Sequence, residues 1–319
     1  MDVRAQEVRR RGLQALSRFF GDTINKALAD PTVIEIMVNP DGTLWIEYLG
    51  EQGMVQVGEM TSAAAMGVIT TVAGMLETVV RPEKPILECE LPLDGSRFEG
   101  MIAPVVTAPS FTIRKKALLV FNLADYVEKG IMTQAQSDVI EKAVADRENI
   151  LVCGGTGTGK TTLANAVLDA VSRLTPRHRL LIIEDTRELQ SKAKNTVLLR
   201  TSDEVNMTQH LRATMRMRPD RIIVGEVRDS SALALLKAWN TGHPGGVGTV
   251  HANNSAAALV RIGQLIQEAG VPPAPELIAE AVNVVVSIVR TQNGGRTIEE
   301  IIRVKGYTPQ SGFAVERIA

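Results

Sequence analysis

The chain has little of several residue types that mark specialised classes of protein. Its 319 residues include two cysteines, Cys89 and Cys153, too few for a disulfide framework or a four-thiolate zinc site. No run approaches the roughly 18 consecutive apolar residues of a membrane-spanning helix, and the best candidate, 281–289, is short and interrupted by Asn283 and Ser287. The first residues lack the apolar core of a signal peptide. We therefore expect a cytoplasmic protein that does not cross a membrane.

Excess charge and aromatic side chains are also scarce. The formal net charge is −1 and aromatic residues make up 3%, so the chain offers no overall attraction to nucleic acid and few rings on which bases could stack. We therefore expect no sequence-specific nucleic-acid binding. Apolar residues at 45% and charged residues at 22% are ordinary for a folded protein, and the length predicts two domains.

The first third of the chain predicts a small α+β domain. Residues 2–29 carry apolar side chains at helical spacing among several arginines, and Asp30-Pro31 ends this pattern. Such a basic amphipathic helix either packs on its own domain, which we favour, or lies on an anionic membrane. The further elements predicted are strands at 33–38 and 43–48 around a tight turn, a helix over 61–78, and strands at 97–102 and 110–114.

After Lys116 the pattern changes to that of an α/β domain. Short apolar runs alternate with segments of helical length, which indicates parallel strands buried on both faces of a sheet. A turn at 293–295 joins two β-rich segments and predicts an antiparallel hairpin at one edge of the sheet. The strands expected are 150–153, 180–183, 197–199, 222–224, 247–250, and the hairpin strands 284–289 and 296–304.

A complete phosphate-binding loop follows the first of these strands. Residues 154–161 read GGTGTGKT, with a strand before them and a helix after them. This order aims backbone N–H groups and a helix N-terminus at the same phosphates, which a chance glycine turn would not do. Lys160 is expected to reach the β- and γ-phosphates and the Thr161 hydroxyl to hold Mg²⁺. The sequence therefore predicts a Mg²⁺-dependent ATPase with the cofactors ATP and Mg²⁺.

Two further strands end in acidic residues. The run 180–183 leads to Glu184 and Asp185, and the run 222–225 leads to Glu226. Because ligands of open α/β sheets bind at the carboxyl ends of strands, these carboxylates are candidates for activating water. Glu184 could alternatively pair with a nearby arginine. Gly225 occupies the usual position of the Walker B aspartate.

Two histidines follow in a glycine-rich segment. His251 comes directly after the strand 247–250 and is a candidate sensor of the γ-phosphate, whereas His243 lies on a turn and is the weaker candidate. A lone histidine is more often structural than catalytic. Neither residue has the partner spacing of a metal site.

Together these motifs resemble the traffic ATPases of bacterial secretion, pilus and conjugation systems, and most closely their conjugative-transfer, TrbB-type branch. That family has a Walker A motif, an Asp box, a Walker B motif ending in Gly-Glu, and a His box in this order. The matching segments are GGTGTGKT at 154–161, IEDTREL at 183–189, RIIVGEVRD at 221–229 and the segment from GHPGG at 242–246 to His251-Ala252. The resemblance covers nearly the whole chain, including the segment IEIMVN at 34–39.

The resemblance implies a fold, a set of site residues and an assembly. It implies an N-terminal α+β (PAS-like) domain at 1–117 and a RecA-like P-loop ATPase domain at 118–319, in a homohexamer with nucleotide between the domains. Glu226 becomes the catalytic carboxylate, assisted by Glu184 at Mg²⁺ or water, with Lys160 and His251. The residues expected to bind nucleotide are Gly154, Gly155, Thr156, Gly157, Thr158, Gly159, Lys160, Thr161, Thr162, Arg97 and Arg114. Without the resemblance, Arg97 and Arg114 would be read as surface or strand-pair arginines.

The function implied is a motor that couples ATP hydrolysis to pilus biogenesis or to translocation of DNA or protein. Its implied partners are inner-membrane channel proteins, and its implied place is the cytoplasmic face of the inner membrane, with possible peripheral contact. Two alternatives stay open at this point: a RecA-like nucleic-acid motor, and a pilus or type II secretion motor. Many type II members carry a four-cysteine metal module that two cysteines cannot form.

Overall fold

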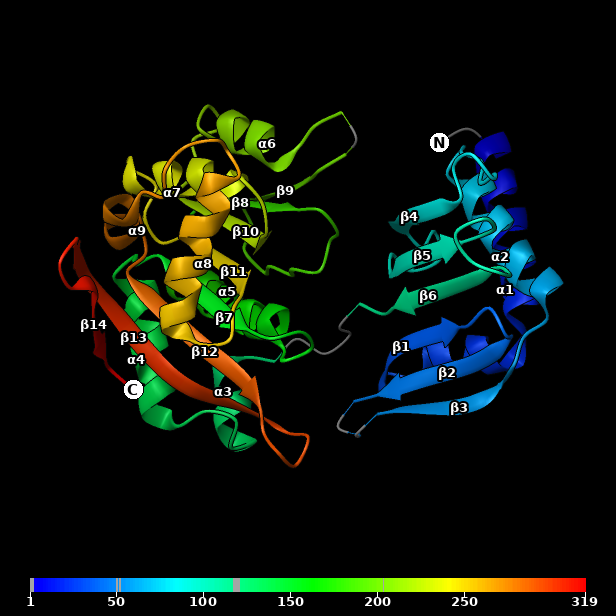
Figure 1. Ribbon diagram of the computed structural model, residues 1–319, viewed down its shortest axis with the longest axis horizontal. Helices are drawn as coiled ribbons and strands as arrows, with labels where there is room; N and C mark the ends of the chain where they lie inside the picture. The colour runs from blue at the N-terminus through cyan, green and yellow to red at the C-terminus, as the bar shows by residue number, and fades with distance from the viewer. Residues whose placement is uncertain (1–2, 50, 52, 117–120, 203) are drawn as a thin grey trace. The chain divides into compact units, whose positions relative to one another are not determined.

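The chain forms two compact units, Met1–Leu119 (unit 1) and Val120–Ala319 (unit 2). The computed structural model describes residues 3–319 except 50, 52, 117–120 and 203 (Figure 1). The domain boundary predicted between residues 117 and 118 lies outside the described residues, as does residue 2 at the start of the predicted first helix.

Unit 1 is an antiparallel sheet with two helices on one face (Figure 1). Apolar side chains alternate along its central strands, so that one face is buried against the helices, as Ile36 and Ile46 are. The strands in order across the sheet are β3 (Met54–Glu59), β2 (Thr43–Tyr48), β1 (Val33–Val38), β6 (Ser110–Arg114), β5 (Arg97–Met101) and β4 (Ile86–Glu90).

The first helix, α1 (Val3–Ala29), packs on its own unit. Its side chains Leu16, Phe20 and Ile24 are buried in the core of unit 1, which confirms the favoured interpretation of the basic amphipathic pattern. The helix kinks at Gly21, whose φ of 69° lies in the left-handed region. The second helix, α2 (Ser62–Met75), begins where the Thr61 side chain accepts a hydrogen bond from the Ala64 N–H at 3.2 Å.

Two strands of unit 1 were not predicted from the sequence. Strands β3 and β4 lie at the two edges of the sheet, and most of their side chains are exposed or half-buried. An edge strand with few buried positions has little need of the apolar alternation by which strands are recognised. Their place in the sheet therefore depends on pairing with β2 and β5.

Unit 2 is built on an eight-stranded mixed sheet (Figure 1). Its six consecutive parallel strands are apolar along most of their length, because helices cover both faces. The order across the sheet is β14 (Gly312–Arg317), β13 (Arg296–Thr308), β12 (Val284–Arg290), β7 (Ile150–Gly154), β11 (Val247–His251), β10 (Arg221–Val227), β8 (Leu180–Glu184) and β9 (Thr196–Arg200).

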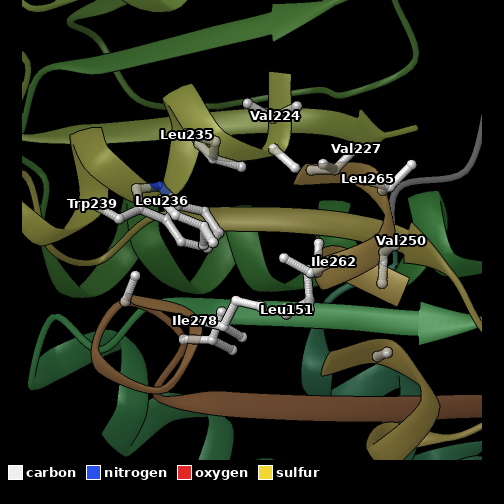
Figure 2. Packing of buried hydrophobic residues seen from close by; sticks show 14 of the residues in the cluster. Leu151, Val224, Val227, Leu235, Leu236, Trp239, Val250, Ile262, Leu265 and Ile278 are labelled. Carbon is white, nitrogen blue, oxygen red and sulfur yellow. The ribbon is translucent and has the colours of Figure 1, made fainter. Parts of the chain in front are cut away.

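Two helical layers form separate apolar cores on the two faces of this sheet. On one face, Trp239 packs with Ile262 against Leu151 and Val224 of the strands (Figure 2), and its indole N–H donates to the Ile222 carbonyl at 3.0 Å. The helices of this face are α6 (Met207–Thr214), α7 (Ser231–Asn240), α8 (Ser255–Gln267) and α9 (Pro275–Ala281), and those of the other are α3 (Leu123–Glu128), α4 (Gln134–Ala145) and α5 (Lys160–Leu174).

The predicted C-terminal hairpin is present, but its predicted place at an edge of the sheet is wrong. Strands β12 and β13 are antiparallel, as expected, while β12 also pairs parallel with β7. Strand β14, which was not predicted, lies beyond β13 and forms the edge. The hairpin thus lies next to the strand that leads into the phosphate-binding loop. Among the described residues, no helix combines the length and the apolar character needed to span a bilayer.

Candidate nucleotide site

The segment GGTGTGKT joins β7 to the N-terminus of α5. Gly157 and Gly159 have φ values of 67° and 95°, a region that other residues rarely adopt, so this loop conformation requires glycine. The first amides of α5 have no carbonyl partner within the helix and carry the positive end of its dipole. A glycine loop followed by a helix N-terminus suits an anion, and the binding of phosphate by residues 154–161 stays a prediction.

Lys160, the first residue of α5, lies across this loop. Its Nζ donates a hydrogen bond to the Gly155 carbonyl at 2.9 Å, and the Thr158 hydroxyl donates to the same carbonyl at 3.0 Å. Burial lowers the pKa of the Lys160 ammonium, while the negative charges of Glu226 and Glu188 oppose that shift. A partly desolvated cation in a cradle of N–H groups favours a highly charged anion such as a polyphosphate.

Glu184 and Gly225 lie side by side on neighbouring parallel strands. The register pairs Ile183 of β8 with Val224 of β10, so the residues after them are adjacent. A Cβ added to Gly225 would lie 2.8 Å from Glu184 Cγ. Glycine at this position therefore leaves room for the buried Glu184 side chain, which explains why no Walker B aspartate stands there.

The Glu184 carboxylate also organises the segment that follows it. Its Oε1 accepts hydrogen bonds from the N–H groups of Glu188 at 3.0 Å and Leu189 at 2.9 Å. Asp185, next in the chain, accepts a hydrogen bond from the Thr201 hydroxyl at 2.6 Å and forms an ion pair with Arg228. The ion pair between Asp185 and Arg228 thus links the segments 183–189 and 221–229.

Glu226 is half-buried at the carboxyl end of β10. Strands β7, β11 and β10 are parallel neighbours, so Glu226 and the loop after β7 lie at the same edge of the sheet. The negative charge of Glu226 acts to raise the pKa of Lys160. The Gly225 carbonyl before it accepts a hydrogen bond from the Thr249 hydroxyl at 2.7 Å, which links β10 to β11. A carboxylate has the chemistry of a general base, and the catalytic role of Glu226 stays a prediction.

Of the two histidine candidates, only His251 lies at the loop. It pairs with Gly154 at the end of β11, and its Nε2 is 3.4 Å from the Thr156 hydroxyl. His243 precedes β11 and therefore lies at the opposite end of this strand. The structure thus separates the weaker candidate from the loop, while the role of His251 stays a prediction.

Two arginines that the sequence analysis did not select also contact the loop. Arg290 at the end of β12 and Arg296 at the start of β13 both donate to the Gly157 carbonyl, at 3.1 and 3.4 Å. In the sequence they only flank a predicted turn. No local pattern marks them, because the loop that they contact lies more than a hundred residues earlier.

Arg97 and Arg114 belong to unit 1 and are neighbours in its sheet. They are paired across β5 and β6, and the Arg114 Nη2 lies 3.3 Å from each carboxylate oxygen of Glu35 on β1. Both positions fit the alternative of strand-pair arginines as well. Their role at the nucleotide stays a prediction.

The residues expected to hold Mg²⁺ offer oxygen atoms, which is the chemistry that this ion prefers. Thr161 is half-buried in the first turn of α5, Glu184 ends β8, and Glu226 is the last residue but one of the neighbouring β10. Among the residues that the structure describes, no group of three His, Cys, Asp or Glu side chains could hold a metal ion. Mg²⁺ in nucleotide sites is held mostly by phosphates, water and one or two protein ligands, so these residues fit it.

Three features occur together here: a glycine loop between a strand and a helix, a lysine over that loop, and carboxylates at the ends of neighbouring parallel strands. Together they define a P-loop nucleotide-hydrolysing protein. The chain belongs to the type II/IV secretion system protein family, which matches residues 21–311. It is an ATPase of this family. The predicted family, the predicted ATPase class and the predicted α/β fold are confirmed.

Several proteins are similar to this chain over most of its length. The probable conjugal transfer protein TrbB of Sinorhizobium fredii is 53% identical over 295 residues, which are 92% of this chain and 90% of that protein. The conjugal transfer protein TrbB of Rhizobium radiobacter is 51% identical over 92% of this chain and 91% of that protein. In fold, the Yersinia pseudotuberculosis ATPase DotB matches with a TM-score of 0.63 at 17% identity, covering 91% of this chain and 79% of that one.

Proposed function

We propose that this chain is the ATP-hydrolysing motor of a bacterial conjugation or type IV secretion system. The observation that carries this proposal is a phosphate-binding loop with Lys160 bonded across it and Glu226 at the same edge of the sheet, in a chain that is 53% identical to a probable conjugal transfer protein. ATP hydrolysis would be coupled to pilus biogenesis or to the translocation of DNA or protein.

The chemistry assigned to the chain's own residues follows from their positions. The amides of 154–161 and the Lys160 ammonium bind the phosphate tail. The Thr161 hydroxyl and Glu184 would hold Mg²⁺, which would neutralise phosphate charge. Glu226 accepts a proton from the attacking water, which becomes bonded to the γ-phosphorus as ADP leaves. His251, hydrogen-bonded to the loop through Thr156, reports the γ-phosphate from the end of β11.

The proposal extends to assembly and place. We propose a homohexamer at the cytoplasmic face of the inner membrane that engages channel proteins and makes peripheral membrane contact. Arg97 and Arg114 are proposed as nucleotide ligands, because an arginine fork suits phosphoryl oxygens and would couple the motion of unit 1 to hydrolysis. The similarity to two conjugal transfer proteins supports the conjugation assignment.

The first test measures steady-state ATP hydrolysis of the purified chain and conjugative transfer in cells that lack the native copy. Lys160→Ala should abolish both activities, and Glu226→Gln should keep ATP binding while kcat falls about 100-fold or more, because a positioned proton acceptor is lost. The exposed residues Lys237 and Glu268 supply the matched controls Lys237→Ala and Glu268→Gln. Near-normal turnover of Glu226→Gln would reject its role, and a wild-type chain without ATPase activity would reject the proposed function.

The second test concerns the arginines of unit 1. Arg97→Ala and Arg114→Ala should each raise KM for ATP or lower kcat while the circular dichroism spectrum stays unchanged. Glu35→Gln serves as the comparison, because it removes the acidic partner of Arg114 and leaves the charge of Arg114 unchanged. Kinetics identical to those of the wild type in both arginine variants would assign them to sheet pairing alone.

A further inference from the structure

The turn of the β12–β13 hairpin places two guanidinium groups at the phosphate-binding loop. Arg290 and Arg296 are partners in the antiparallel register, so they face each other across the last pair before the turn at 291–295. Both donate to one acceptor, the Gly157 carbonyl. Forming a hairpin does not require two cations to donate to one carbonyl of a phosphate-binding loop.

The loop is shaped for this approach at three of its glycines. A Cβ on Gly157 would lie 2.4 Å from Arg290 Nη2, and one on Gly159 would lie 3.2 Å from Arg296 Cδ. At the start of the loop, a Cβ on Gly154 would lie 2.4 Å from the Ile288 carbonyl oxygen. The hairpin therefore approaches the loop closely at these three glycines, where the absence of a Cβ leaves space for it.

The contact determines how one peptide group of the loop is oriented. In a planar trans peptide, the carbonyl of one residue and the N–H of the next point in opposite directions. Drawing the Gly157 carbonyl toward the hairpin therefore turns the Thr158 N–H away from it. An N–H fixed in this way needs no reorganisation when an anion binds.

The two arginines also change the charge around the loop. A guanidinium stays protonated at any physiological pH, and its charge adds to that of Lys160. The acidic side chains that act on Lys160, Glu226 and Glu188, belong to β10 and to the segment after β8. Strand β12 lies on the other side of β7 in the sheet, so positive and negative groups approach the loop from different strands.

We propose that Arg290 and Arg296 are positioning residues of the nucleotide site. They hold the Gly157–Thr158 peptide with its N–H toward the phosphate tail, and their two charges favour ligands with more phosphates. This inference rests on the proposed function, because the ligand is the ATP of that site. Arg290 is exposed and Arg296 is half-buried. They act by orienting the loop peptide and by adding positive charge near it, and they do not contact the reacting atoms.

The test measures equilibrium binding of ATP, ADP and AMP, each with Mg²⁺, to the full-length chain. Arg290→Ala and Arg296→Ala should each raise Kd for ATP about tenfold, the effect expected of one hydrogen bond to a charged group, and should raise Kd for AMP much less. Arg290→Lys and Arg296→Lys keep the charge without the fork and should recover part of the loss. Asn293→Ala, at the tip of the same hairpin, is the matched control and should bind as the wild type does.

Two further readouts distinguish positioning from a role in folding alone. In steady-state kinetics, KM for ATP should rise while kcat stays within about twofold, because the loop amide binds ground state and transition state alike. The difference in ATP affinity between wild type and the alanine variants should shrink as salt rises, since exposed charges are screened. If an alanine variant does not fold, its lysine counterpart decides by the same measurements.

The outcomes separate this inference from the function on which it rests. If wild type binds ATP and Lys160→Ala does not, but the arginine variants bind ATP as wild type does, the inference is wrong and the proposed function stands. An equal loss of affinity for ATP and AMP, unaffected by salt, would also overturn it, because only folding would then be affected. If wild type itself binds no ATP, the proposed function fails first.

Discussion

At the scale of single residues, the nucleotide site depends on a glycine that leaves space for a neighbouring carboxylate. Gly225 lets the buried Glu184 carboxylate lie over β10 and accept two backbone hydrogen bonds. A methyl group there would have to displace a nearly fully buried charged side chain, since no space remains between the two strands.

Gly225→Ala should therefore lower kcat for ATP hydrolysis about tenfold or more, with a smaller change in ATP affinity, because it moves Glu184 while the loop stays intact. The measurement is steady-state kinetics together with nucleotide binding. Gly58→Ala is the control, because a Cβ on Gly58 in β3 would meet no atom within 4 Å. Full activity of Gly225→Ala would show that Glu184 can move without consequence.

A second residue-scale feature lies at the other end of the same strand. Arg221 at the start of β10 is 1% exposed and donates to the carbonyls of Gly245 and Val144, at 2.8 and 2.7 Å. Its Nε donates to His178 Nδ1 at 3.1 Å, so this histidine must present an unprotonated nitrogen. Burial and the positive charges of Arg221 and Arg147 lower the pKa of His178.

This pKa shift predicts a loss of stability in acid. Because the folded chain holds His178 neutral, its contribution is present above the unfolded pKa of 6.5 and is lost as pH falls below that value, where the unfolded chain binds the proton more readily. Urea unfolding at pH 7.5, 6.5 and 5.5 should show a free energy of unfolding that becomes smaller as the pH is lowered. The decrease should be smaller in His178→Gln; parallel curves would contradict the assignment.

At the scale of elements, α1 shows that a basic amphipathic helix can serve its own fold. Its apolar side closes the core of unit 1, where Leu16 and Ile24 are fully buried, while Glu7 pairs with Arg10 and Arg11 on the exposed side. Exposed ion pairs of this kind contribute little to stability. The apolar stripe is therefore the part of α1 on which unit 1 depends.

Leu16→Ala should destabilise unit 1 by about 2–5 kcal/mol, the usual cost of removing a buried leucine side chain. Leu13→Ala, at a half-buried position on the same helix, should cost clearly less. Chemical denaturation followed by far-ultraviolet circular dichroism measures both. Equal costs at the two positions would mean that the helix is not packed through the side that contains Leu16.

At the scale of the whole molecule, each unit has its own apolar core. One cluster lies under α1 and α2 in unit 1, and two lie on the faces of the sheet of unit 2. The two tryptophans of the chain are divided between them, with Trp45 in β2 and Trp239 in α7. Each unit therefore has a fluorescent reporter of its own.

Separate cores predict separate responses to a core substitution. Phe98 is buried and stacks on Phe111 in unit 1, so Phe98→Ala should destabilise that unit by about 3–5 kcal/mol. In a Trp239→Phe background, Phe98→Ala should lower the urea midpoint reported by the remaining Trp45. In a Trp45→Phe background, Phe98→Ala should leave the urea midpoint reported by Trp239 unchanged. Equal shifts of both probes would mean that the chain unfolds as a single cooperative unit.

Much of this molecule follows from local sequence. The order of strand, glycine loop and helix around Lys160, the apolar runs of the parallel strands, and the acids that follow them are set by residues close together in the chain. Their physical requirements are local too: glycine for a positive φ, apolar side chains for a strand covered on both faces, and a helix N-terminus for a phosphate. The ATPase class and the family were therefore predictable from the sequence.

Other features were decided only by the tertiary structure. The edge strands β3, β4 and β14 exist because a neighbouring strand pairs with them, and their exposed side chains carry little pattern of their own. The contact of Arg290 with Gly157 joins residues 133 positions apart, and Glu184 meets Gly225 only because β8 and β10 are neighbours in the sheet. Such contacts arise from the packing of distant segments, which spacing along the chain does not encode.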